Sequence, residues 1–174
     1  TNKRKIPEAE IFTMLDNYTF KGGIPKKLGD TRVPTIPCSI KRNYVRTALC
    51  DLGAGVSVMP LCLYRRLELN KLTPTEISLQ MANKSTAIPV GICEDVPVVV
   101  ANVTILTDFV ILDIPKDDSM SIILGRPFLN TAWAVIDCNK GNVTFMLMVM
   151  SIRYIFRGNN LKFIASNHLS SNQL

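Results

Sequence analysis

The sequence predicts a single mainly β domain with one or two short helices. Its 174 residues, 47% of them hydrophobic, suffice to bury one sizeable core but are few for two ordinary domains. Short runs rich in β-branched and aromatic residues alternate with polar turns, as strands do. Only residues 60–70 space their apolar side chains as an amphipathic helix would.

The strands follow from these runs in chain order. Residues 34–40 and 44–50 flank a polar turn, which predicts a hairpin that delivers Asp51 at the end of its second strand. Residues 77–82 and 86–90 flank Asn83, Lys84 and Ser85 and predict a second hairpin. Further strands are predicted at 96–100, 103–112, 133–137 and 142–149.

Charge divides the chain unevenly. Lysine and arginine outnumber aspartate and glutamate by 20 to 14, and residues 1–46 contain ten basic against four acidic residues, which accounts for the whole excess. We therefore expect a basic linker or arm at 1–32, a folded domain at 33–149 and a divergent, poorly ordered tail at 150–174. This distribution argues against nucleic-acid binding by the folded domain.

Several kinds of chemistry are excluded by what the sequence lacks. Its one histidine, His168, lies in the polar tail, so neither a Ser-His nor a Cys-His nucleophile has a well-held base. The five cysteines are scattered without a CxxC pair, which argues against a zinc site and a disulfide framework. No glycine-rich phosphate loop occurs. We expect no metal and no cofactor, and carboxylates remain as the reactive groups.

The sequence also bears on location. No charged start followed by an apolar stretch is present, so we expect an intracellular protein that is not secreted. The apolar run from Val143 to Ile152 is shorter than the roughly 20 residues of a membrane-spanning helix and predicts a buried strand.

One aspartate of nine has a distinctive context. Asp51 follows an apolar strand and begins a glycine-bearing turn, in Ala48-Leu-Cys-Asp-Leu-Gly-Ala-Gly55. Gly53 permits backbone angles barred to other residues and lets a second chain approach closely. An Asp-x-Gly turn alone is common in ordinary proteins. A second signal adds specificity: the apolar run of Ser121-Ile-Ile-Leu-Gly-Arg-Pro-Phe-Leu129, which ends at Gly125.

Together these two segments, with a hairpin between them, resemble the retropepsin-like fold of aspartic proteases. The flanking text is similar to the protease region of plant Ty3/gypsy-type retrotransposon polyproteins over about residues 24–147, and to the DNA-damage-inducible type of retroviral-like protease. The matching segments are Ile24-Pro-Lys-Lys-Leu-Gly-Asp30, Ile36-Pro-Cys38, Ala48-Leu-Cys-Asp-Leu-Gly-Ala54, Met59-Pro60, Gly91-Ile-Cys-Glu-Asp-Val96, Asp108-Phe-Val-Ile-Leu-Asp113 and Ile123-Leu-Gly-Arg-Pro-Phe128.

The resemblance implies a closed β lobe in each chain and an aspartic endopeptidase that hydrolyses peptide bonds in a polyprotein. Because only one candidate aspartate is present, two chains must form a homodimer that places Asp51 beside its symmetry mate. Two such carboxylates share a proton, which implies an acidic to mildly acidic optimum. Leu52, Gly53 and Ala54 complete the active-site turn.

Other residues acquire roles from the same resemblance. The hairpin at Asn83, Lys84 and Ser85 matches the flap that closes over a peptide, and is otherwise a plain surface hairpin. Gly125 matches the glycine that lies against the active-site turn. For Arg126 we expect a structural ion pair, although Gly55 stands where the arginine's usual acidic partner would be.

The sequence departs from the family at Leu52, where most members carry a hydroxyl, and at Trp133, where a small residue is usual. Two alternatives therefore stay open. One is a catalytically inactive dimerisation module of the same fold, or a degenerate transposon relic. The other is a nucleic-acid-associated structural protein that binds through the basic N-terminal arm, although no aromatic stacking pattern supports it.

Overall fold

The computed structural model describes residues 34–69, 71–81, 84–114, 122–147, 150–156 and 162–167. Within these ranges the chain is mainly β, with two short helices, as the sequence predicts. In chain order the elements are β1 (Thr35–Ile40), β2 (Asn43–Cys50), β3 (Ser57–Pro60), α2 (Leu61–Arg66), β4 (Leu79–Gln80), β5 (Thr86–Ala87), β6 (Gly91–Val100), β7 (Val103–Leu112), β8 (Ile123–Leu124), α3 (Arg126–Thr131), β9 (Ala134–Asp137), β10 (Asn142–Leu147), β11 (Met150–Ile155) and β12 (Lys162–Asn167).

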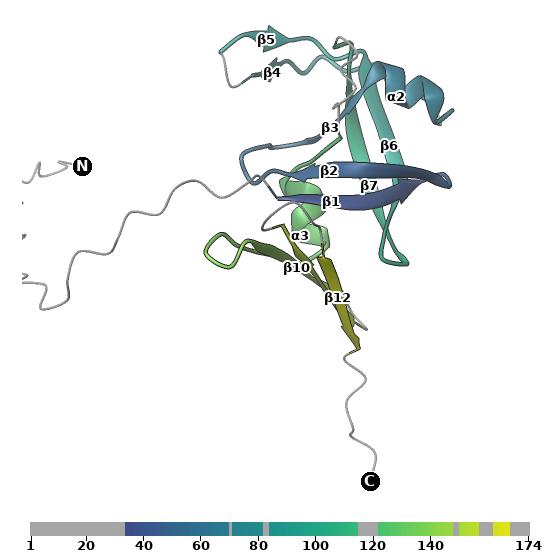
Figure 1. Ribbon diagram of the computed structural model, residues 1–174. Helices are drawn as coiled ribbons and strands as arrows, with labels where there is room; N and C mark the ends of the chain where they lie inside the picture. Colours follow the sequence, from purple (N-terminus) through teal and green to yellow (C-terminus); the bar gives the residue numbers. More distant parts are fainter. Residues whose placement is uncertain are drawn as a thin grey trace, which may run out of the picture. The chain divides into compact units, whose positions relative to one another are not determined.

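Six of these strands close into a barrel with the order β1-β2-β8-β3-β7-β6 (Figure 1). Most neighbours run antiparallel, but β8 is parallel to β2, and β3 is parallel to β7. Closure leaves no unpaired barrel edge at which another chain could add a strand. Because β8 is inserted between β2 and β3, the apolar-apolar-glycine segment lies next to the turn that begins at Asp51.

The first hairpin forms as the sequence predicts. β1 buries alternate residues, Ile36, Cys38 and Ile40, and exposes more of those between them. Lys41 and Arg42 form the connecting turn with φ of 45° and 65°. Both angles lie in the left-handed region that two-residue hairpin turns require. The turn therefore sets the register that places Cys50 and Asp51 at the far end of β2.

The two helices are short. The predicted helix at 60–70 is α2, which begins at Leu61 and ends at Arg66, with Pro60 as its N-cap. Pro60 lacks an N–H and has a fixed φ, so it fits a helix start. No helix in the described part of the chain is long and apolar enough to span a membrane.

The main apolar core joins the barrel to the C-terminal strands. Phe109, Phe128 and Phe145 are fully buried within it. Phe145 on β10 makes edge-to-face contacts with Phe128 on α3 and with Tyr154 on β11, at centroid distances of 6.3 and 6.1 Å. Such aromatic pairs contribute about 0.5–1.5 kcal/mol each beyond their burial. They fix α3 between the barrel and the C-terminal sheet.

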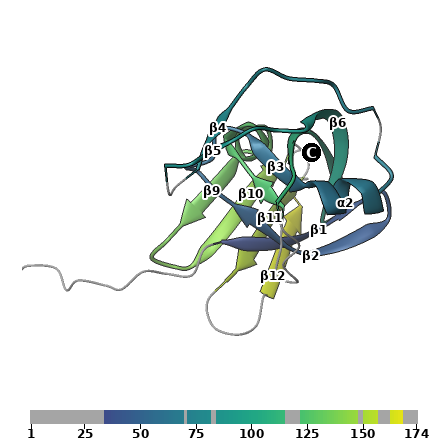
Figure 2. The same cartoon turned by 90° about the horizontal axis from the view of Figure 1, so that it is seen from above.

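The C-terminal strands correct one expectation. Residues 150–174 were expected to form a poorly ordered tail, yet β11 and β12 extend an antiparallel sheet with the order β12-β11-β10-β9 (Figure 2). The reason is alternation on β11, where Ile152 and Tyr154 are buried against the main core. The predicted strand at 142–149 is β10. His168 and the expected basic arm at 1–32 lie outside the described residues.

Candidate active site

Asp51 is held by backbone contacts on both sides of its Cα. Its N–H donates to the carbonyl of Leu124 at 3.1 Å, which anchors the end of β2 to β8. Its carboxylate Oδ1 accepts the N–H of Gly53 at 2.8 Å, and its carbonyl accepts the N–H of Ala54 at 3.3 Å. The carboxyl group is half-buried. The turn therefore presents one oriented carboxylate at the surface of the barrel.

Strand β8 supports this turn from beneath. The N–H of Leu49 donates to the carbonyl of Ile122 at 2.9 Å, and Leu49 and Cys50 pair in parallel with Ile123 and Leu124. On its other side Ile123 pairs with Val58 of β3. Strand β8 thus contacts the strands both before and after the Asp51 turn, which is why the two sequence signals belong to one site.

Gly125 packs against the backbone of the turn. A Cβ atom at this position would lie 2.3 Å from the carbonyl oxygen of Val56 and 3.0 Å from that of Ala54, so only glycine fits. Its N–H donates to Ser57 Oγ at 3.1 Å, and Ser57 is almost fully buried. The sequence prediction included Gly125 but not Ser57. A lone serine at the start of a strand gave no signal that its hydroxyl would accept from a segment 68 residues later.

The structural ion pair expected for Arg126 stays a prediction, and the described residues show no ion pair of this side chain. Its guanidinium Nη1 instead donates to the Leu52 carbonyl at 3.4 Å, and its backbone N–H donates to the Ala54 carbonyl at 2.9 Å. Gly55 explains the difference, because no acidic side chain stands there. A Cβ at Gly55 would lie 3.3 Å from Arg126 Nη2. Arg126 therefore fixes the turn through backbone carbonyls.

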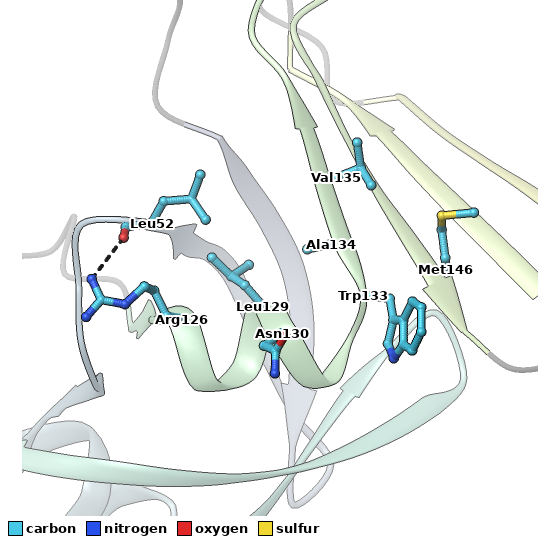
Figure 3. A pocket seen from close by; sticks show the side chains of 8 residues that line it. All are labelled: Leu52, Arg126, Leu129, Asn130, Trp133, Ala134, Val135 and Met146. Atoms are coloured by element: carbon cyan, nitrogen blue, oxygen red, sulfur yellow. Dashed lines mark hydrogen bonds between the residues drawn. The ribbon is translucent and has the colours of Figure 1, made fainter.

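Leu52 projects outward from the turn. Its side chain is 59% exposed, and Figure 3 shows it pointing toward Leu129, while the Leu52 carbonyl faces the guanidinium of Arg126. A leucine has no hydroxyl with which to form a hydrogen bond to a second turn. Leu52 therefore presents an exposed apolar side chain next to Asp51.

The second predicted hairpin forms with shorter strands than expected. Strands β4 and β5 pair over Leu79–Gln80 and Thr86–Ala87. At the turn, the N–H of Met81 donates to the carbonyl of Ser85 and the N–H of Lys84 donates to that of Met81, both at 2.8 Å. Lys84 adopts a left-handed φ of 66°. Asn83 lies outside the described residues.

A small apolar cluster lies between this hairpin and the barrel. Val58, Val110 and Leu112 are buried in it, and Leu79 and Ala87 of the hairpin pack against them. Ile123 of β8 also contacts the cluster. The hairpin therefore packs on the same side of the barrel as β8, the strand that pairs with the end of β2 next to Asp51.

A hollow of about 380 Å³ shares Val110 with this cluster. Its walls are mainly apolar and include two exposed carboxylates, Glu94 and Asp108. Asp108 Oδ1 accepts the N–H of Asp95 at 2.9 Å. The residues around the hollow are Val56, Ser57, Ile77, Ile92, Glu94, Leu106, Thr107, Asp108, Val110, Pro127, Phe128 and Thr131.

Thiol chemistry is disfavoured beside Asp51. Burial raises the pKa of Cys50 to about 12, with a further increase from nearby Cys38, and burial raises the pKa of Cys38 to about 12 as well. A thiol with so high a pKa is protonated at neutral pH and is a poor nucleophile. The carboxylate of Asp51 is thus the reactive group that the turn presents.

One family model and two solved structures are similar to this chain. The family model described as retroviral aspartyl protease matches residues 37–150. The retroviral protease-like domain of Ddi1 from Leishmania major has a similar structure, with a TM-score of 0.50 and 23% identity over 68% of this chain and 88% of that one. The protease of EIAV, in complex with the inhibitor HBY-793, aligns with a TM-score of 0.42 and 24% identity over 62% and 92%.

No curated protein sequence matches the chain significantly. The similarity to the Ddi1 domain shows the fold alone, and the family match spans well over half of the sequence. It contains both the Asp51 turn and the Gly125 segment. The chain therefore belongs to the retroviral aspartyl protease family.

Proposed function

We propose that the chain is an aspartic endopeptidase that works as a homodimer, with Asp51 contributed once by each copy. The observation that carries the proposal is the fixed orientation of the Asp51 carboxylate, which accepts the Gly53 N–H at 2.8 Å in a turn supported by β8. Membership of the family supports the same chemistry. One copy supplies only one such carboxylate, so the site is incomplete without a second copy.

The paired carboxylates divide the work of hydrolysis. One Asp51 in its ionised form accepts a proton from a water molecule held between the pair, and the water oxygen attacks the scissile carbonyl carbon. The other, protonated Asp51 donates its proton as the carbonyl oxygen becomes a hydroxyl. Collapse of this tetrahedral species breaks the C–N bond. The leaving amine takes up the proton that the first Asp51 accepted from water, and one hydroxyl of the tetrahedral species returns a proton to the second Asp51, which leaves a carboxylic acid product and the pair in its starting state. One shared proton is needed, because two carboxylates about 3 Å apart do not both ionise.

The substrate is an extended peptide, which we propose to be a segment of the polyprotein from which the chain itself derives. The hairpin of β4 and β5, with Lys84 and Ser85 in its turn, acts as the flap and adds main-chain hydrogen bonds to that peptide. The apolar cluster of Val58 and Val110 supports this role, since it lies beside the hairpin and contacts β8. We also propose an intracellular setting and an origin in a plant Ty3/gypsy-type element.

The test is cleavage of an unfolded protein substrate by the purified chain, across about pH 4 to 7. Asp51→Asn, which keeps the side-chain shape but cannot act as the base, is assayed beside it. Molecular mass is recorded for both proteins. We expect cleavage by the dimeric wild type only, with a maximum at acidic to mildly acidic pH. Cleavage that survives in Asp51→Asn, or that rises steadily above neutral pH, would contradict the proposal.

A second candidate function is a dimerisation module of the same fold without activity. It is favoured by Leu52, which provides no hydroxyl to connect two active-site turns. A stable dimer that fails to cleave any substrate in the assay above would support this alternative. Cleavage that Asp51→Asn abolishes would reject it.

A further inference from the structure

An exposed apolar patch adjoins the Asp51 turn. It consists of Leu52, Trp133, Val135 and Met146, whose side chains are 59%, 73%, 53% and 49% exposed. The four residues line one hollow of about 470 Å³ together with Arg126, Leu129, Asn130 and Ala134 (Figure 3). A group of exposed apolar side chains around one hollow is the kind of surface at which soluble proteins bind a partner.

Trp133 is held in this patch by a strained backbone. It follows Ala132, the C-cap of α3, and has a φ of 48°. This left-handed position after a helix normally holds glycine, and a bulky residue there is disfavoured. Its N–H donates to the carbonyl of Asn130 at 3.0 Å, and its own carbonyl accepts the N–H of Met146 at 3.3 Å. Such strain in an exposed aromatic residue indicates that the side chain has a function.

The patch is continuous with the site through Leu52, which follows Asp51 directly and whose carbonyl accepts a hydrogen bond from Arg126. A second copy that brings its Asp51 beside the first must therefore cover Leu52. Because a twofold interface uses the same surface on both copies, the rest of the patch is brought to the interface twice.

We infer that the patch is the dimer seam, in which Trp133 of each copy packs on the apolar surface of the other and holds the two Asp51 turns together. This inference rests on the proposed function, since the paired carboxylates are what require a second copy. According to this inference, Leu52 and Trp133 join the two turns by apolar contact. Aromatic anchors of this kind dominate the energetics of protein interfaces.

The observations favour a second copy over a different partner. The four residues of the patch are all apolar, and the charged side chain that lines the hollow, Arg126, donates to the Leu52 carbonyl of its own chain. The patch itself therefore offers no pattern of charges for an unlike protein to match. A small apolar ligand would fill the hollow but would leave Asp51 single. Only a second copy both covers the patch and completes the site.

The chain contains one tryptophan, so its fluorescence reports directly on Trp133. The experiment dilutes full-length Asp51→Asn, which does not digest itself, and follows the emission maximum alongside mass by sedimentation. We expect a dimer at high concentration, with a red shift of the emission on dilution at the midpoint where the mass halves. A monomer at every concentration, or a dimer whose emission does not change as it dissociates, would overturn the inference.

A substitution at Trp133 provides a second test of the inference. Trp133→Gly removes the anchor and the backbone strain together, so we expect a dimer dissociation constant raised at least tenfold with an unchanged or higher melting temperature of the monomer. Tyr44→Ser removes another exposed aromatic, on β2 and outside the patch, and should leave association unchanged. Equal dimer affinity for Trp133→Gly and wild type would refute the seam.

These results separate the seam from the proposed enzyme activity. A wild-type dimer that buries Trp133 but cuts nothing retains the seam and rejects the endopeptidase. A dimer that cuts while Trp133 stays exposed retains the endopeptidase and rejects the seam.

Discussion

Gly125 and Val56 are in such close contact that a Cβ atom on Gly125 would lie 2.3 Å from the Val56 carbonyl oxygen. Val56 leads from the active-site turn into β3, and Gly125 leads from β8 into α3. The backbones of the two segments therefore touch with no side chain between them. The same approach lets the Arg126 N–H donate to the Ala54 carbonyl at 2.9 Å.

Gly125→Ala should disrupt this contact, because the clash is with backbone atoms that cannot rotate away. We expect a loss of about 3 kcal/mol in the free energy of unfolding, from strain in a close-packed interior. Urea denaturation followed by circular dichroism measures it. Asn130→Ala, on the exposed side of α3, is the matched control and should change stability by less than about 0.5 kcal/mol. Equal denaturation midpoints for the two variants would contradict this account.

Ser57→Ala tests the buried side-chain hydrogen bond between the two segments. Ser57 is 1% exposed and its Oγ accepts the Gly125 N–H at 3.1 Å. The alanine leaves that buried N–H without a partner, which costs about 1–3 kcal/mol. Thermal melting should show the loss. Thr131→Ala removes a hydroxyl that donates to Pro127 within α3 at an exposed position, and should cost much less. If Thr131→Ala is the more damaging change, Ser57 lacks the role given to it.

The fold could be predicted because its signals are local. The turn at Lys41 and Arg42, the alternation along β1 and the helix start at Pro60 each depend on a few neighbouring residues. The tail was mispredicted for a different reason. Strand β11 does alternate buried and exposed residues, but so short a pattern does not show which surface the strand packs on. Tyr154 is buried beside Phe145 of the neighbouring strand β10.

Some residues of the site could likewise be predicted from the sequence, and others could not. The Asp51 turn and Gly125 could be identified from short motifs, because one needs a sharp turn and the other lacks a side chain. Ser57 and the Leu52 carbonyl that Arg126 binds could not, since their partners come from segments about seventy residues away. The strained φ of Trp133 is likewise a property of the folded backbone. The sequence shows only that a large residue stands at position 133.

Gly53→Ala separates the orientation of the carboxylate from the stability of the fold. The added Cβ would lie 3.1 Å from Asp51 Oδ1, the oxygen that accepts the Gly53 N–H. We expect a fold within about 1 kcal/mol of wild type, since the neighbour is a movable side-chain end. A displaced carboxylate should nevertheless lower kcat/KM by about tenfold to a hundredfold.

Gly55→Ala is the matched control for this variant. It adds a Cβ to the same turn, 3.3 Å from the flexible end of Arg126 and away from the carboxylate. Its kcat/KM should stay within about threefold of wild type, well inside the loss expected for a displaced carboxylate. An equal fall in activity for both variants would show that the turn as a whole is sensitive, and not the position of Asp51.

Stability should fall at alkaline pH because of three buried thiols, those of Cys38, Cys50 and Cys93, and the largest contributions come from Cys38 and Cys50. Burial raises the pKa of Cys38 and of Cys50 from 9.0 to about 12 in the folded chain. Above pH 9 the unfolded chain releases these protons while the folded chain retains them, so the folded state binds more protons and loses stability as pH rises. The contribution is complete below pH 9 and declines between pH 9 and about 12. Each thiol changes the unfolding free energy by up to about 1.4 kcal/mol per pH unit.

Urea denaturation at about pH 8, 9 and 10 measures this slope, which should appear only above the ordinary thiol pKa. The double variant Cys38→Ala, Cys50→Ala should be less stable near neutral pH, because two buried groups are truncated. Its slope over the same interval should be clearly shallower than that of the wild type, and buried Cys93, whose pKa burial also raises, accounts for part of what remains. Cys62→Ala, at an exposed position, should retain the wild-type slope. A double variant as steep as wild type would show that groups other than these thiols release the protons on unfolding.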